Sequence, residues 1–148
     1  MLPKNCTKLI DQIIKGIIIS TTPHLKHDET VSQIEQVFRK HGFYTTREYP
    51  IYKMKDNSGR AGRIDLVARK GKFRVAVEYD HHALIKWKSF QKIVQIKPDV
   101  AIAISGLGYL KFNLERASKY VDKQIPIYVV SLIQHTYNKL GEVTGKRK

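Results

Sequence analysis

Apolar residues recur at helical spacing in the first forty residues of the chain. In residues 5–19 they fall three or four positions apart with charged residues between them, which predicts an amphipathic helix. A second stripe of the same period predicts a helix over residues 29–41, with Asp28 as its N-cap. Gly42 is placed to end this helix in the left-handed conformation.

From residue 43 onward the pattern becomes that of strands. Residues 43–53 are rich in aromatic and β-branched side chains and predict a strand, in which Pro50 indicates an edge position or a bulge. Residues 63–69 and 73–80 predict two further strands, which form a hairpin around the turn at residues 70–72.

The second half of the chain alternates between helical and strand patterns. Pro98 ends one predicted helix, which has Trp87 and Phe90 on its inward side, and Asn113 is the expected cap of another. The predicted strands are continuous apolar runs, as in strands buried on both faces. These elements are, in order, a helix over residues 83–97, a strand over 100–105, a helix over 114–123 and a strand over 125–133.

The resulting order, α-α-β-β-β-α-β-α-β, predicts an α/β fold with a mixed central sheet flanked by helices. A length of 148 residues is typical of one domain. We therefore expect a single domain over residues 1–148, with an N-terminal helix within 1–20, a core over 28–133 and a basic tail over 141–148.

Cysteine content and apolar runs bear on the cellular compartment. The single cysteine, Cys6, excludes an internal disulfide and a cysteine-based zinc site. No apolar run approaches the length needed to cross a bilayer, and the first residues lack a signal-peptide pattern. We expect a cytoplasmic or nucleoid-associated protein that is not secreted and not bound to a membrane.

Net charge is the feature that departs most from an average domain. Lys and Arg total 27 against 13 Asp and Glu, which gives a formal net charge of +14 at pH 7. Such an excess favours a polyanionic partner, because neutralised phosphates release counterions and supply binding free energy. An acidic membrane surface is disfavoured, because the chain lacks a basic helix with a bulky aromatic face. The expected partner is DNA.

Acidic residues are scarce, and three of them fall on the predicted hairpin. A two-residue turn at residues 71–72 sets Asp65 opposite Glu78, with Asp80 further along the same face. A turn one residue earlier changes the partner of Asp65 but keeps the three carboxylates on one face. Directly opposed like charges destabilise a hairpin. A divalent cation relieves this repulsion, and oxygen ligands favour Mg²⁺, with Mn²⁺ able to substitute; the alternative is a structural network with nearby arginines or lysines.

This arrangement resembles the PD-(D/E)xK nuclease superfamily, which includes restriction endonucleases and Holliday-junction resolvases. The resemblance lies in residues 62–65 (Gly-Arg-Ile-Asp) and 78–80 (Glu-Tyr-Asp), on the second and third strands of a unit that spans residues 29–105. It implies a restriction-endonuclease-like three-layer core and metal-dependent hydrolysis of phosphodiesters. Asp65 and Glu78 would then hold Mg²⁺, which activates an attacking water.

The sequence departs from the family pattern at the lysine of the motif, whose place is taken by Asp80. Asp80 is therefore expected either as a third metal ligand or as a residue that merely fills this position. Other members of the superfamily take the lysine from the following helix, where Lys86 and Lys88 are the candidates. A glutamate from the first core helix often completes such sites, and Glu35 fits that place. Loss of catalysis is the remaining alternative.

Basic residues near the acidic cluster form the expected nucleic-acid surface. Contacts of this kind position the phosphate backbone without reading bases. His81 and His82 follow the motif and are candidates for phosphate contact or proton transfer, whereas His24 and His27 have no partner in the sequence and receive no role. The expected nucleic-acid-binding residues are Lys53, Lys55, Arg60, Arg63, Lys70, Lys72, Arg74, His81 and His82.

The expected function is therefore a Mg²⁺-dependent endodeoxyribonuclease that acts on duplex or branched DNA and uses no small-molecule cofactor. Two alternatives stay open: a non-catalytic nucleic-acid-binding protein that keeps the nuclease fold, and an RNA-processing nuclease. Because one such site cuts one strand, we expect a homodimer. Its apolar surface is expected from residues 6–18 or from the late helix with Leu114 and Tyr120.

Overall fold

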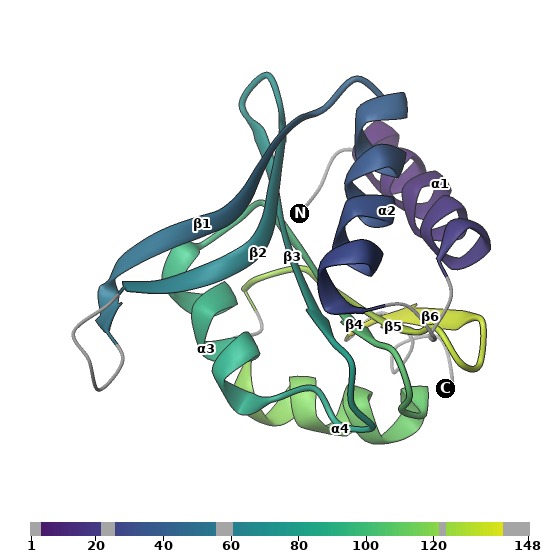
Figure 1. Ribbon diagram of the computed structural model, residues 1–148, viewed down its shortest axis with the longest axis vertical. Coiled ribbons are helices and arrows are strands. Elements are labelled where there is room, and N and C mark those ends of the chain that lie inside the picture. Colours follow the sequence, from purple (N-terminus) through teal and green to yellow (C-terminus); the bar gives the residue numbers. More distant parts are fainter. Residues whose placement is uncertain (1–3, 22–25, 56–60, 122–123, 141–148) are drawn as a thin grey trace.

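The computed structural model describes residues 4–21, 26–55, 61–121 and 124–140, and the strands within these ranges form one six-stranded sheet (Figure 1). The helices are α1 (Lys4–Ser20), α2 (His27–Lys40), α3 (Trp87–Ile96) and α4 (Leu110–Tyr120). The strands are β1 (Tyr44–Lys55), β2 (Ala61–Lys70), β3 (Phe73–Asp80), β4 (Val100–Ser105), β5 (Ile127–Ser131) and β6 (Thr136–Lys139). The expected basic tail over residues 141–148 lies outside the described residues.

The predicted α/β fold with a mixed sheet is confirmed. The strands follow the sequence order from β1 to β6, antiparallel from β1 to β3 and parallel from β3 to β5. Strand β6, which pairs antiparallel with β5, is absent from the prediction. It has four residues, none of them fully buried, so it carries little of the periodicity from which strands are predicted.

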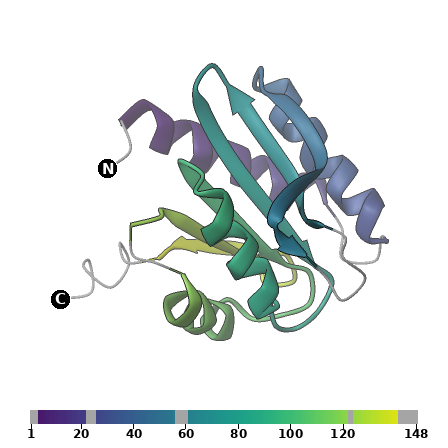
Figure 2. The ribbon, with the colours of Figure 1, turned by 90° about the vertical axis from the view of Figure 1, so that its left-hand side faces the viewer.

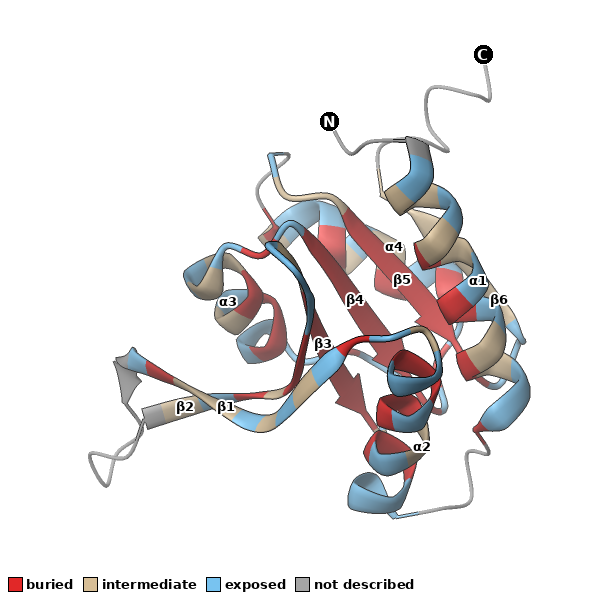
Figure 3. Ribbon diagram, turned by 90° about the horizontal axis from the view of Figure 1, so that it is seen from above, coloured by how far each residue is buried: buried red, intermediate tan, exposed pale blue. Residues whose placement is uncertain are grey.

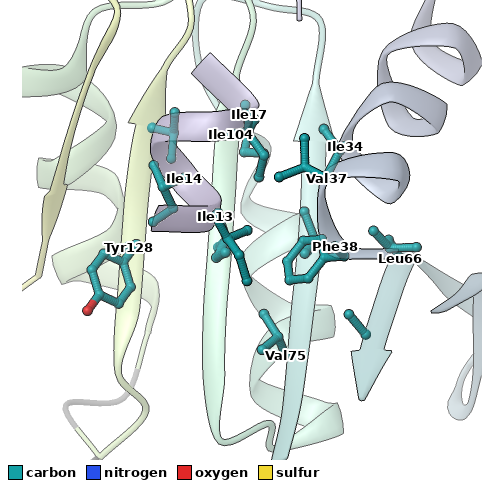
Figure 4. Packing of buried hydrophobic residues seen from close by; sticks show 14 of the residues in the cluster. Ile13, Ile14, Ile17, Ile34, Val37, Phe38, Leu66, Val75, Ile104 and Tyr128 are labelled. Carbon is teal, nitrogen blue, oxygen red and sulfur yellow. The ribbon is translucent and has the colours of Figure 1, made fainter. Parts of the chain in front are cut away.

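Helices cover both faces of the sheet, α1 and α2 one face and α3 and α4 the other (Figures 2 and 3). On the first face, Ile13, Ile14 and Ile17 of α1 and Phe38 of α2 are completely buried against the strands (Figure 4). Burying each such side chain stabilises the fold by about 1.5–3 kcal/mol. The apolar stripe of α1 thus belongs to the core of its own chain.

This packing corrects the expected dimer surfaces. The apolar residues of α1 face the sheet, and Leu114 and Tyr120 of α4 pack against the cluster on the second face. The ring of Tyr120 stacks on that of Phe90, with centroids 6.3 Å apart. The buried stripe of α1 is thus not available to a partner, whereas Leu114 and Tyr120 are only partly buried, and the homodimer itself stays a prediction.

The predicted register of the β2–β3 hairpin is confirmed. Lys70 pairs with Phe73 and Leu66 pairs with Val77, so two residues form the turn. Gly71, the first of them, has a positive φ of 61° that glycine adopts without a steric penalty. This register brings Asp65 beside Glu78, because each lies one residue beyond the Leu66–Val77 pair.

Helix α3 begins at Trp87 rather than at residue 83, because Asp80 fixes its start. One carboxylate oxygen of Asp80, Oδ2, accepts hydrogen bonds from the Lys86 N–H at 3.0 Å and from the Ser89 hydroxyl at 2.8 Å. Residues 81–86 therefore form a loop. Trp87 is 49% exposed, so its predicted inward position is wrong.

The N-caps predicted for α2 and α4 are also wrong. Lys26 precedes α2 at the cap position, and Asp28 lies in the first turn of that helix. Asn113 lies inside α4 and is completely buried. Its side chain accepts a hydrogen bond from the Ile85 N–H at 2.8 Å and donates one to the Ala83 carbonyl at 3.0 Å, so it ties α4 to the loop before α3.

Candidate active site

The three hairpin carboxylates meet in a cleft of about 520 Å³ at the carboxyl end of β3, where β2, α2 and α3 approach one another. The cleft is lined by Lys26, His27, Asp65, Glu78, Tyr79, Asp80, His81, His82, Lys86, Lys88, Ser89 and Lys92. Seven expected site residues therefore come together, namely Asp65, Glu78, Asp80, His81, His82, Lys86 and Lys88. Four lysines and three histidines surround three carboxylates, so the cleft attracts anions while it holds a buried acidic centre.

Asp65 and Glu78 are each hydrogen bonded to the backbone of the neighbouring strand. Glu78 Oε2 accepts the Asp65 N–H at 2.7 Å, and Asp65 Oδ2 accepts the Tyr79 N–H at 2.8 Å. Carboxylate oxygens thus take the place that carbonyl oxygens have in a regular ladder, which fixes both side chains between β2 and β3. Glu48, across from Asp65 on β1, has a positive φ of 50°, an uncommon conformation for a residue with a side chain.

His27, the first residue of α2, joins this cluster although no role was predicted for it. Its Nε2 lies 3.4 Å from Asp65 Oδ1 and 3.0 Å from the Tyr79 carbonyl oxygen. The hydrogen bond with Asp65 outweighs partial burial and raises the pKa of His27 to about 9, so the imidazole is charged at neutral pH. Burial acts to raise the pKa of Asp65, but the hydrogen bonds from His27 and Tyr79 prevail and lower it.

Glu78 is the most deeply buried carboxylate of the cleft, with a side chain that is 3% exposed. Burial, reinforced by the charge of Asp65, raises the pKa of Glu78 to about 8. Lys92 opposes this shift, since its Nζ lies 3.6 Å from Glu78 Oε1. At neutral pH and without a bound cation, the cleft therefore holds an ionised Asp65 beside a mostly protonated Glu78.

We expect the stability of the metal-free protein to fall as the pH rises from about 5 to about 9. The folded state raises the pKa of His27 from 6.5 to about 9 and that of Glu78 from 4.5 to about 8, so it binds both protons more tightly than the unfolded chain does. Each contribution is fully present below the unfolded pKa and is lost as the pH passes the folded pKa. Thermal unfolding in EDTA across this range measures the slope.

Two variants separate these contributions. Glu78→Gln should flatten the fall in Tm between pH 5 and 8, and His27→Gln should flatten it between pH 6.5 and 9. Glu48→Gln, which changes an exposed carboxylate outside the cleft, is the matched control and should keep the parental slope. A Tm that rises over this range would contradict the arrangement of protons described above.

Asp80 lies at the cleft but serves to anchor a helix. Its Oδ2 accepts both the Lys86 N–H and the Ser89 hydroxyl, as described above, so this oxygen caps α3. Within the described residues, no three side chains of His, Cys, Asp or Glu are arranged to hold one metal ion. One oxygen of Asp80 is thus bound at the start of α3, and the expected role of Asp80 as a third metal ligand beside Asp65 and Glu78 stays a prediction.

Glu35 is not brought to the cleft, which corrects its expected role. Its Oε2 accepts the Thr45 hydroxyl at 2.6 Å and pairs with Arg39 at 3.3 Å, while Oε1 lies 3.8 Å from Arg47. These partners lie on α2 and β1. The buried glutamate thus joins the helix to the edge strand.

Lys92 reaches the acidic centre, although Lys86 and Lys88 were the lysines expected there. All three line the cleft, but Lys92 is the one whose ammonium pairs with Glu78. A signal for it existed in the sequence: Lys92 follows Ser89 by three residues and Lys88 by four, which places the three on one face of a helix. For His27 no such signal exists, because its partners lie on strands far away in the sequence.

The predicted basic surface is divided between two ends of the hairpin. Lys70 donates to the His41 carbonyl, and Arg74 donates to the carbonyls of Ile96 and Lys97 at the end of α3, so both support the fold at the turn end. Lys72 lies exposed at the same end, and Arg63 pairs with Glu48. The side chains of Lys53 and Lys55, and the whole of Arg60, lie outside the described residues.

Comparison with known proteins identifies no relative of this chain. No protein-family model matches the chain, and no curated protein matches it significantly. Among the described helices, none is both long and apolar enough to cross a membrane.

Proposed function

We propose that this protein is a metal-dependent nuclease that hydrolyses phosphodiester bonds in DNA, with a restriction-endonuclease-like core. The observation that carries the proposal is the Asp65–Glu78 pair, fixed between two strands and ringed by basic side chains. The order α2-β1-β2-β3-α3-β4, with an antiparallel hairpin followed by a parallel strand, supports the resemblance to PD-(D/E)xK nucleases.

The donors of the cleft fit a divalent cation of the Mg²⁺ class. Asp65 and Glu78 supply carboxylate oxygens, and the Tyr79 carbonyl lies beside them. In the metal-free protein the charged His27 contacts one oxygen of Asp65 and the Tyr79 carbonyl, and a divalent cation at these oxygens would replace the imidazolium as their partner. When bound, Mg²⁺ or Mn²⁺ would polarise the phosphate and lower the pKa of an attacking water.

Other residues of the cleft supply the charge stabilisation, phosphate binding and positioning that the Asp65–Glu78 pair does not. Lys92 holds Glu78 in place and presents a positive charge to the developing charge on the phosphate, the role of the motif lysine. Lys86, Lys88 and His82 line the mouth of the same cleft and bind phosphates of the substrate backbone. Asp80 positions α3, and with it the three lysines, by capping the helix.

A cleavage assay across DNA forms tests the proposal. Supercoiled plasmid, linear duplex, branched and single-stranded DNA are incubated with Mg²⁺ or Mn²⁺, with EDTA as control. Metal-dependent cutting of at least one form is the expected result. Binding without cutting of any form would favour a non-catalytic binding protein, the alternative that Asp80 at the lysine position supports, and a preference for structured RNA would indicate an RNA-processing enzyme.

Glu35→Gln should lower stability and leave cleavage intact. The change leaves Arg39 without a carboxylate partner and Arg47 with Asp28 alone, and it removes the charge from a nearly buried acceptor, at a cost of about 1–3 kcal/mol. Urea unfolding measures the loss, and cleavage below the melting transition should match the parent. A variant of unchanged stability that no longer cuts would return Glu35 to the active site.

A further inference from the structure

Six of the nine large hydrophobic side chains that are exposed among the described residues lie at one edge of the sheet. They belong to the loops that follow β3, β4 and β5 and to the first turns of α3 and α4. We call this surface the aromatic rim, and its residues are Leu84, Trp87, Leu107, Tyr109, Phe112 and Ile133.

Close contacts hold the segments of the aromatic rim together. Asn113 of α4 donates to the Ala83 carbonyl at 3.0 Å, and the Leu110 N–H donates to Gln134 Oε1 at 2.7 Å. Gly108 lies so near this carbonyl that a Cβ would stand 1.7 Å from the Ala83 oxygen, which leaves room for glycine alone. The loops after all three strands are thus fixed against one another, and the rim is a preformed surface.

The aromatic rim adjoins the candidate active site. The His82 carbonyl accepts the Ser105 hydroxyl at 2.8 Å and the Leu107 N–H at 3.4 Å, which joins the loop of the rim after β4 to the loop that lines the cleft. A strand of substrate that left the cleft on this side would therefore meet the rim.

The positive charge around the aromatic rim indicates which kind of partner it binds. Residues 81–98, 106–114 and 132–140 contain no Asp or Glu, while lysines stand between the apolar positions. A second copy of the chain would bring these basic surfaces together and be repelled. A partner that is anionic and also offers flat apolar faces satisfies both properties, and nucleotides with unpaired bases are of this kind.

We propose that the aromatic rim binds unpaired bases of a single-stranded DNA segment beside the cleavage site. The inference rests on the proposed nuclease function and specifies its substrate as DNA with a single-stranded arm, gap or flap. Phe112 and Tyr109, both more than half exposed, supply the stacking surfaces, and Lys111 between them faces the backbone phosphates.

Binding measurements in EDTA test this inference without any cleavage. A fluorescent oligo-dT of about 15 nucleotides and a duplex of the same length are titrated with the parent protein and with Phe112→Ala, Phe112→Leu and Tyr109→Ala. Each variant should bind the single strand about tenfold more weakly and the duplex with nearly parental affinity. Tyr44→Ala, which removes a still more exposed ring at the start of β1, is the control and should bind both like the parent.

Trp87, the single tryptophan of the chain, gives a second readout on the unlabelled parent. Its fluorescence should be quenched by the single strand and much less by the duplex. Equal effects of the variants on single strand and duplex, or no effect at all, would overturn the inference. So would a parental dimer that Phe112→Ala converts to a monomer in light scattering, because the rim would then be an interface between copies.

The experiments distinguish a failure of the proposed nuclease function from a failure of the proposed base-binding surface. A protein that cuts DNA but whose rim variants bind single strands normally is a nuclease without this base-binding surface. A protein that binds single strands through the rim but cuts no DNA form with either metal retains the surface and loses the nuclease function.

Discussion

Replacing Glu78 by glutamine should reduce metal-dependent cleavage by about 10³-fold or more, equivalent to about 4 kcal/mol of transition-state stabilisation. The amide removes the charge on which a Mg²⁺ ligand depends, but its oxygen still accepts the Asp65 N–H. Because the pKa of Glu78 is about 8 in the metal-free fold, glutamine resembles the protonated form already present at neutral pH. The Tm at pH 7 should therefore change little, and DNA binding in EDTA should be unchanged or tighter.

Asp65→Asn should give the same loss of cleavage with a larger loss of stability. Its amide oxygen still accepts the Tyr79 N–H, but the ion pair with His27 disappears. Glu48→Gln, on the neighbouring strand and outside the cleft, should cut like the parent. Cleavage by Glu78→Gln at the parental rate would mean that the chemistry lies elsewhere in the molecule.

Lys92→Met should lower kcat by about 10²-fold with little change in KM for DNA. The ammonium lies 3.6 Å from Glu78 Oε1, where it also holds down the pKa of that carboxyl. Its removal should therefore raise the pH at which metal-dependent activity reaches half of its maximum. That shift of the pH profile separates the proposed role from a loss of fold, and Lys92→Arg should restore much of it.

Lys86→Met and Lys88→Met are the matched comparisons, because both side chains line the same cleft without an ion pair to Glu78 among the interactions described above. They should raise KM and reduce the salt dependence of DNA binding, since each removes about one phosphate contact. If Lys88→Met instead gave the larger fall in kcat, Lys88 would take the place of the motif lysine and Lys92 would be structural.

The acidic pair could be predicted from sequence because it depends on local rules. The alternation of apolar residues along β2 and β3 places the carboxylates on one face whichever of the two turns forms, and the turn at residues 71–72 then sets Asp65 beside Glu78. The identity of the helix lysine depends on where α3 begins. That point is set by a side-chain bond from Asp80, which no pattern within the helix reveals.

His27 lay beyond prediction for a different reason. Its position beside Asp65 follows from how α2 packs on the sheet, and that packing is determined by side chains such as Ile34 and Phe38 elsewhere on the helix. The same holds for Glu35: its helical stripe was predicted correctly, yet the packing of α2 on the sheet places it beside Thr45 of β1 and away from the cleft, where it also pairs with Arg39 of its own helix.

The position of Asp80 at the start of α3 has a consequence for any substitution at this residue. In the proposed nuclease, position 80 of the motif sets where a helix starts, and Lys92 on that helix is the lysine that lies near Glu78. A single mutation back to lysine would put a cation beside the helix N-terminus, which favours negative charge, and would release the segment that carries Lys92. We therefore expect Asp80→Lys to disturb both the start of α3 and the placement of Lys92 beside Glu78.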